Sequence, residues 1–171
     1  VEDYRRELDL RTGISSVSYR SGNVNYEREI FSSFVDQVMV ISIKSSQAGV
    51  LTLCANLSRR PYDGESCVVS KDTVIMRGEC GKDGIRFACM MKASVKGGSV
   101  CTVGDFLSIE NADEVTIIIA ANTTFYHDDP ETVCEMQIAK AGEFTFKELK
   151  ERHIADYRTL YNRVQLKVDK D

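Results

Sequence analysis

The strongest structural signal in the chain comes from residues 114–121, which read EVTIIIAA. From Val115 to Ala120 only Thr116 is polar, so a strand built from this run has two apolar faces. Such a strand is typical of the middle of a sheet that is covered on both sides. We therefore expect residues 114–121 to form a central strand, with a second sheet of a β-sandwich supplying the cover.

The same kind of pattern extends from Tyr4 to this run. Period-two alternation or short apolar runs are broken about every ten residues by turn residues, which is typical of antiparallel β structure. Turns such as Gly97-Gly98 supply residues that tolerate positive φ, so they favour hairpins over βαβ crossovers. The predicted strands are residues 4–10, 14–19, 24–34, 38–44, 50–58, 73–78, 85–96, 99–103, 106–110 and 114–121. Residues 59–66 combine charge, proline and glycine and are predicted to be the longest irregular loop.

The period changes after Asn122. Asp129 followed by Pro130 predicts a helix over residues 130–141, because aspartate caps a helix and proline suits its first position. Thr145 and Glu148 have capping-box spacing and predict the start of a second helix. Its amphipathic stripe contains Phe146, Leu149, His153, Tyr157, Leu160, Tyr161 and Val164. A short strand is possible at residues 165–168. The predicted fold class is mainly β, an antiparallel β-sandwich portion over residues 1–124, with two C-terminal helices within residues 125–171.

Composition places the chain among single globular domains. It has 171 residues, of which 43% are hydrophobic and 28% charged, with a formal charge of -4. No window approaches the roughly 20 apolar residues that span a bilayer, so we expect no membrane partner. The acidic balance lacks a Lys/Arg stripe, so we expect no nucleic-acid partner. Because the chain begins at Val1 and runs straight into a patterned segment, we expect it to be part of something longer.

Six cysteines occur without any C-x-x-C pair, which gives a structural zinc site little support. They are Cys54, Cys67, Cys80, Cys89, Cys101 and Cys134. A chain of this length and hydrophobicity does not need disulfides, so we expect several of these residues to be small core hydrophobes in a reducing compartment. This favours a cytoplasmic location, with a secreted parent protein as the alternative. We expect no metal and no organic cofactor.

Two histidines and two acids are candidates for acid-base chemistry, but each also has a simpler structural role. His127 precedes a helix cap and is expected to be at the surface, whereas His153 lies on the helix stripe and is expected to be partly buried with a hydrogen-bond partner. Asp36 and Glu79 lie beside strands, where acids usually serve turns or edges. We predict no catalytic, cofactor-binding or metal-binding residue. A complete enzyme that uses His127 or His153 remains an alternative.

A series of motifs resembles a known family. The N-terminal β-sandwich domain of glycoside hydrolase family 95, the α-L-fucosidases, has similar segments in the same order. They are residues 4–10 (YRRELDL), 17–19 (VSY), 28–33 (REIFSS), 36–38 (DQV), 76–78 (MRG), 84–87 (GIRF), 97–98 (GG), 112–115 (ADEV), 120–123 (AANT) and 153–164 (HIADYRTLYNRV). The resemblance covers nearly the whole chain.

The resemblance implies a non-catalytic domain of a fucosidase. In that family the catalytic carboxylates and asparagines lie in an (α/α) barrel that follows the sandwich, and no position here matches a catalytic motif. The implied partners are that barrel, reached through residues 125–171, and an oligosaccharide that carries a terminal fucosyl linkage. The family's earliest strands have no counterpart here, so an exposed sheet edge is expected to permit self-association. The alternative is a free-standing carbohydrate-binding module that uses a surface tyrosine such as Tyr62.

Overall fold

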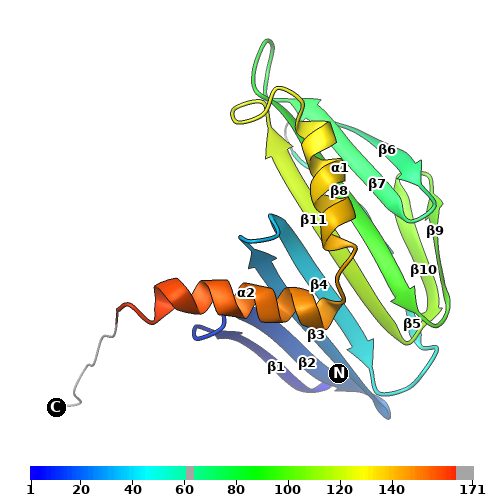
Figure 1. Ribbon diagram of the computed structural model, residues 1–171. Coiled ribbons are helices and arrows are strands. Elements are labelled where there is room, and N and C mark those ends of the chain that lie inside the picture. The colour runs from blue at the N-terminus through cyan, green and yellow to red at the C-terminus, as the bar shows by residue number, and fades with distance from the viewer. Residues whose placement is uncertain (61–63, 165–171) are drawn as a thin grey trace.

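The computed structural model describes residues 1–60 and 64–164, which form strands followed by two helices (Figure 1). The strands are β1 (Glu2–Asp9), β2 (Ile14–Ser21), β3 (Val24–Ser33), β4 (Val38–Ser45), β5 (Leu51–Ala55), β6 (Glu65–Ser70), β7 (Thr73–Glu79), β8 (Arg86–Lys96), β9 (Ser99–Val103), β10 (Phe106–Ala112) and β11 (Glu114–Thr123). The helices are α1 (Pro130–Ala141) and α2 (Phe146–Tyr161).

The described strands form two antiparallel sheets. The larger sheet has eight strands in the order β1-β2-β3-β4-β11-β8-β7-β6, and the smaller has three in the order β5-β10-β9. Both helices lie on one face of the larger sheet (Figure 1), and the smaller sheet packs on its other face. The predicted mainly β antiparallel sandwich with two C-terminal helices is confirmed.

Strand β11 is the centre of this arrangement. It pairs with β4 on one side and β8 on the other, with Ile118 opposite both Val40 and Lys92. Its neighbouring residues Ile117 and Ile118 are both buried, but in different cores. The expected cover on both faces is therefore present, although helices cover one of the two faces. A second sheet alone could not have done this, because a two-layer sandwich covers each sheet on one face only.

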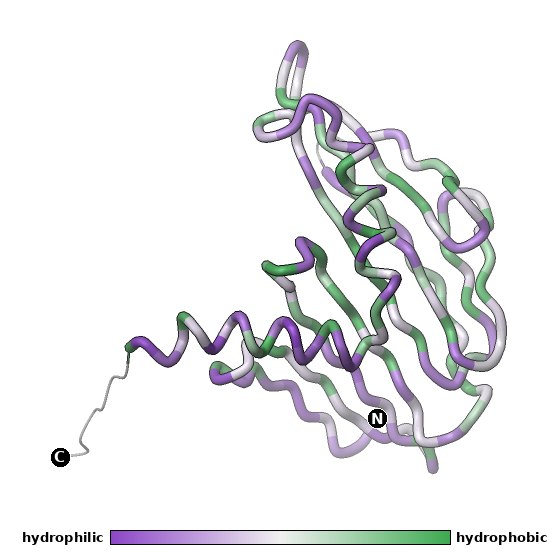
Figure 2. Tube along the Cα trace, in the orientation of Figure 1, coloured by the Kyte–Doolittle hydropathy of each residue, from purple (hydrophilic) through white to green (hydrophobic). Residues whose placement is uncertain are grey.

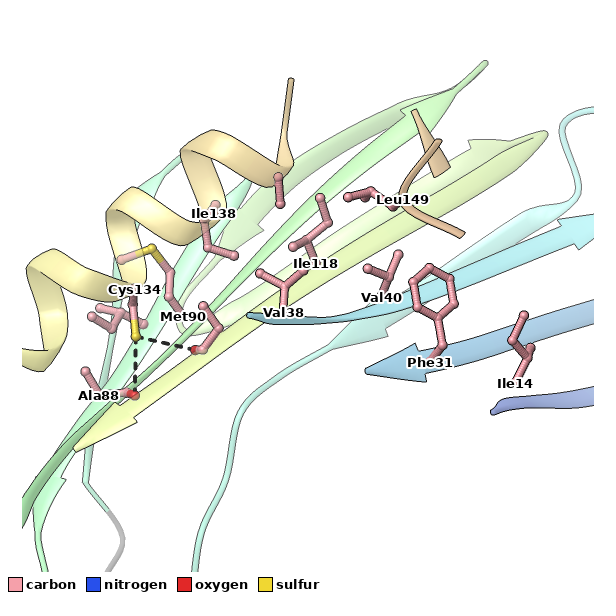
Figure 3. Close-up of a cluster of buried hydrophobic side chains, with 13 residues drawn as sticks. Ile14, Phe31, Val38, Val40, Ala88, Met90, Ile118, Cys134, Ile138 and Leu149 are labelled. Carbon is pink, nitrogen blue, oxygen red and sulfur yellow. Dashed lines mark hydrogen bonds between the residues drawn. The ribbon is translucent and has the colours of Figure 1, made fainter. Parts of the chain in front are cut away.

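The helix-side core lies between the larger sheet and the two helices. Figure 3 shows Val38, Ile118 and Ile138 in its middle, with Phe31 and Leu149 toward α2. Its buried members are Ile14, Phe31, Val38, Val40, Ile75, Ala88, Met90, Ile118, Ala120, Cys134, Ile138, Ala141 and Leu149. The helices thus contribute to the core of the sheet.

The second core lies between the two sheets. Its buried members are Ile43, Leu51, Val74, Met91, Ala93, Leu107, Ile109, Ala112, Val115 and Ile117. Figure 2 shows hydrophobic residues along β4 and β11 and hydrophilic ones along the outer strand β1. Strand β1 also has an irregular register between Glu2 and Arg5, and charges with such irregularities discourage edge-to-edge pairing.

Both helices begin as their sequence signals predict. The Asp129 side chain accepts a hydrogen bond from the Thr132 backbone N–H, and Pro130 occupies the first position of α1. At α2 the Thr145 backbone N–H donates to Glu148 over 2.7 Å, and the Glu148 N–H donates to the Thr145 hydroxyl. The Thr145 backbone N–H and hydroxyl both donate to the Glu148 carboxylate, and these two bonds hold the pKa of Glu148 below its ordinary value.

Two elements depart from the sequence prediction. Strand β5 ends at Ala55, although it was expected to continue to Ser58, and β6 was not predicted as a strand. Residues Glu65–Ser70 form β6, at the edge of the larger sheet, although the irregular loop was expected to continue to Ser66. The strand pairs on one side only, with β7, and none of its residues is buried, so its sequence lacks the alternation of apolar and polar residues that marks the predicted strands. The possible strand at residues 165–168 lies outside the described residues. No helix in the described part is both long and apolar enough to cross a membrane.

Candidate functional site

The middle of α2 holds His153 against the turn between β1 and β2. The His153 ring is buried, its Nε2 donates to the Thr12 carbonyl oxygen over 2.9 Å, and it stacks on Phe31 with ring centroids 4.8 Å apart. The neighbouring turn of the helix brings the Tyr157 hydroxyl within 2.8 Å of the Leu10 carbonyl oxygen, to which it donates. His153 therefore has the hydrogen-bond partner that was expected, and it is buried where partial burial was expected.

Asp36 lies in the turn between β3 and β4 and is bound from α2. Its Oδ2 accepts from the Ser33 hydroxyl over 2.7 Å, and its Oδ1 accepts from two nitrogens of Arg152 over 2.8 and 3.0 Å. The Arg152 guanidinium also lies 4.6 Å from the Phe144 ring centroid. This buried carboxylate joins the turn to the helix, which is consistent with the turn role expected of Asp36.

Sequence reasoning did not identify Arg152 as the partner of Asp36. The two residues are 116 positions apart, so no local spacing links them. The one available signal was the position of Arg152, three residues after the buried Leu149 and next to His153, which places it at the margin of the buried stripe.

The other candidates lie elsewhere. His127 is exposed in the connection between β11 and α1, and Glu79 is exposed at the end of β7. Figure 1 shows that this connection is far from α2, so the two histidines do not share a site. Tyr62 lies outside the described residues.

A charged cleft of about 700 Å³ lies beside the start of α1. Its lining includes Glu65, Arg77, Glu79, Arg86, Phe87 and Asp128. Arg77 forms an ion pair with Glu131 at 3.1 Å. Bonds from the Thr132 hydroxyl and backbone N–H lower the pKa of Asp129, which also lines this cleft. A general acid for glycoside hydrolysis needs a raised pKa, so Asp129 fits its capping role and not that chemistry.

The burial of the six cysteines varies. Only Cys134 is buried, although several core cysteines were expected, and Cys67, Cys80 and Cys89 are partly buried. Cys134 lies on the buried face of α1, and its Sγ is 3.5 Å from the carbonyl oxygens of Ala88 and Ala120 (Figure 3). Cys54 and Cys101 are exposed on the smaller sheet. In residues 1–60 and 64–164 no three His, Cys, Asp or Glu side chains come together in a way that could hold a metal ion.

We expect alkylation by iodoacetamide at pH 8 to modify Cys54 and Cys101 and to spare Cys89 and Cys134. Burial raises the pKa of the Cys89 thiol to about 11 and also raises that of Cys134. Only about one Cys89 in a thousand is then a thiolate at pH 8, and this fraction rises about tenfold with each pH unit up to the pKa. Peptide mass spectrometry measures the labelling, and the urea-unfolded chain, in which all cysteines are accessible, is the control. Equal labelling of Cys134 and Cys54 in the folded chain would contradict this expectation.

Comparison with known proteins gives these features a family context. Residues 1–128 match the model of a family described as glycosyl hydrolase family 65, N-terminal domain. The chain belongs to this family. The match spans the strands of both sheets. This N-terminal domain therefore has the sandwich, and the relationship to glycoside hydrolases, that the sequence motifs indicated.

The curated relatives of this N-terminal domain carry fucosidase names. It is 30% identical to alpha-L-fucosidase 2 of Arabidopsis thaliana, over 95% of this chain and 23% of the relative. It is 25% identical to probable alpha-fucosidase A of Aspergillus oryzae, over 94% of this chain and 25% of the relative. The resemblance to the N-terminal domain of the α-L-fucosidases is confirmed. The chain spans about a quarter of the length of these relatives.

A solved structure shares the fold. A putative kojibiose phosphorylase from the human microbiome superposes with a TM-score of 0.64 at 14% identity, over 94% of this chain and 25% of that one. At this identity the likeness shows the fold alone. Here too the matching part is a quarter of a larger protein.

Proposed function

We propose that this chain is the non-catalytic N-terminal domain of a longer glycosidase that hydrolyses terminal α-L-fucosyl linkages. The observation that carries the proposal is the alignment of 95% of the chain with about a quarter of alpha-L-fucosidase 2. About three quarters of that relative lies outside the aligned part. We assign the chemistry to that remainder, as an (α/α) barrel reached through residues 125–171, and an oligosaccharide as its substrate.

The carboxylates of the described residues support this division of labour. Glycoside hydrolysis uses two carboxyl groups, one of which must stay protonated as the general acid. Asp36 forms an ion pair with Arg152, with 2.8 Å between the Arg152 nitrogen and Asp36 Oδ1. Hydrogen bonds or ion pairs hold the pKa of five carboxyl groups below the ordinary value: Asp9, Asp72, Glu114, Asp129 and Glu148. Lowered values suit ion pairs and helix caps, not proton donors.

The test is an activity assay on an aryl α-L-fucoside. We expect turnover by a longer gene product that contains this domain and no turnover by the purified 171-residue chain. In the longer protein, His127→Ala and Glu79→Gln are expected to keep kcat within about twofold, because neither residue touches the reacting atoms. Activity of the 171-residue chain alone would return the chemistry to this domain. Turnover of α-glucosides in place of fucosides would overturn the substrate class.

A further inference from the structure

Helix α2 carries an apolar stripe that is longer than the sheet surface beneath it. Phe146 and Leu149 pack into the helix-side core, and His153 stacks on Phe31 of β3. One turn later the Tyr157 ring lies on Gly13, so closely that a Cβ on Gly13 would come within 2.9 Å of it. Gly13 belongs to the turn between β1 and β2, where the larger sheet ends. Tyr157 is thus the last stripe residue with sheet structure beneath it.

The stripe continues past this point without cover. Leu160 and Tyr161 in the last turn of α2, and Val164 three residues after its end, are 62%, 40% and 79% exposed, and we call these three residues the overhang. The Tyr161 ring stacks on Tyr157 at a centroid distance of 5.8 Å, so the overhang is a direct extension of the buried stripe. Figure 1 shows the end of α2 running on beyond the β1–β2 turn.

The overhang differs from the scattered apolar residues of any protein surface. Residues three and four positions apart on a helix share a face, so the spacing from His153 through Tyr157 to Leu160 and Tyr161 is that of one docking face. The last turn of an isolated helix is marginally stable in water without packing. Exposed arginines flank the face, Arg158 on the helix and Arg163 just after it. Asp156, four residues before Leu160, lies at the same rim, so the rim carries both signs of charge. An apolar centre with a charged and polar rim is typical of a protein-protein interface.

We infer that the overhang is the docking surface for the catalytic domain that follows α2 in the longer glycosidase. This rests on the proposed function. The family is described as an N-terminal domain, so the rest of such a protein follows it in the chain, and the relatives are about four times as long. The overhang lies at the C-terminal end of α2. A domain that follows α2 in the chain is tethered close to this face, at a high effective concentration.

Hydrogen exchange measures the cover of this face directly. We expect the amides of residues 158–164 to exchange rapidly in the 171-residue chain and at least about tenfold more slowly in the longer protein. The amides of α1 provide the internal reference, because that helix packs on the sheet in both proteins. Leu160→Asp in the longer protein is expected to restore rapid exchange at residues 158–164.

Ala155→Asp is the matched control for Leu160→Asp. It adds the same charge to the same helix at an exposed position away from the stripe. In the 171-residue chain the two variants are expected to have melting temperatures that agree within about 2 °C, since neither side chain is buried there. In the longer protein only Leu160→Asp is expected to loosen the overhang.

Three outcomes would overturn the docking surface. The first is equally rapid exchange of residues 158–164 in both proteins. The second is equal loss of protection in the Leu160→Asp and Ala155→Asp variants. The third is protection in the 171-residue chain that grows with concentration together with a dimer in sedimentation, because a second copy would then be the occupant. A longer protein that cleaves fucosides with an unprotected overhang refutes only the docking surface, and one that is protected but inactive on fucosides refutes only the proposed function.

Discussion

Phe31→Ala is expected to lower the free energy of unfolding of the 171-residue chain by about 3–5 kcal/mol. The Phe31 side chain is 2% exposed and projects from β3 into the helix-side core. Its ring contacts two residues of α2, with centroids 4.8 Å from His153 and 5.8 Å from Phe146. Truncation removes the ring and leaves a cavity between the sheet and the helix, and the rigid sheet can collapse only partly into it.

Phe34→Ala is the matched control for this substitution. Phe34 is three residues further along the chain and 76% exposed, so the same chemical change is expected to cost less than about 0.5 kcal/mol. Urea unfolding followed by circular dichroism gives the midpoint of each variant. The midpoints can be compared directly when the dependence of the free energy of unfolding on urea concentration, the m-value, is the same for both. Similar midpoints for the two would mean that α2 does not pack on β3 in solution, and the helix-side core would have to be assigned to other contacts.

Local pattern was sufficient for most of the elements in this chain. The run 114–121 predicted the central strand β11 because its apolar residues occupy both faces, and the capping residues Asp129 and Thr145 predicted where each helix begins. These signals depend on neighbours a few residues apart, which a sequence displays directly. Strand β6 was not predicted, because none of its residues is buried and its sequence therefore lacks the alternation of apolar and polar residues.

Contacts between distant segments were not predictable in this way. Asp36 and Arg152 meet only because α2 crosses the turn between β3 and β4, and nothing near either residue specifies that crossing. The same holds for the cover of β11. Its two apolar faces required two covering layers, but whether sheets or helices supplied them depended on how residues 125–164 fold back. Topology, rather than propensity, placed these groups together.

Along α2, too, local spacing was predictable from the sequence and the contacts with distant segments were not. The interpretation of His153 as a hydrogen-bonded side chain on the helix stripe was correct, because its helical spacing already placed it there, although the residue is more deeply buried than expected. The overhang could not be seen in the sequence, since Leu160, Tyr161 and Val164 continue the stripe without interruption. Only the end of the sheet at the β1–β2 turn separates the buried part of the stripe from the exposed part.

Gly98→Ala is expected to be far more destabilising than Gly104→Ala, although both glycines lie in hairpin turns beside β9. Their φ angles are +62° and +61°, so a side chain costs each about 1–2 kcal/mol through the left-handed backbone alone. A Cβ on Gly98 would in addition lie 2.1 Å from the Glu110 carbonyl oxygen, whereas a Cβ on Gly104 would meet nothing within 4 Å. The backbone of β10 must move to relieve this clash, which adds about 1–3 kcal/mol or more.

The two variants distinguish two reasons why a position requires glycine: a positive φ, which both positions have, and a lack of space for a Cβ, which only Gly98 has. The Gly97-Gly98 pair predicted a hairpin because glycine tolerates positive φ. The structure shows a second reason at Gly98, whose backbone lies close to that of Glu110, beside the pairing of Ser99 with Glu110. Urea midpoints of Gly98→Ala and Gly104→Ala measure the difference, with the common left-handed cost cancelling between them. Equal decreases in the free energy of unfolding would show that the β10 backbone can move at Glu110 without a cost in stability. A larger loss at Gly98 means that the smaller sheet depends on this approach to hold β9 and β10 in register.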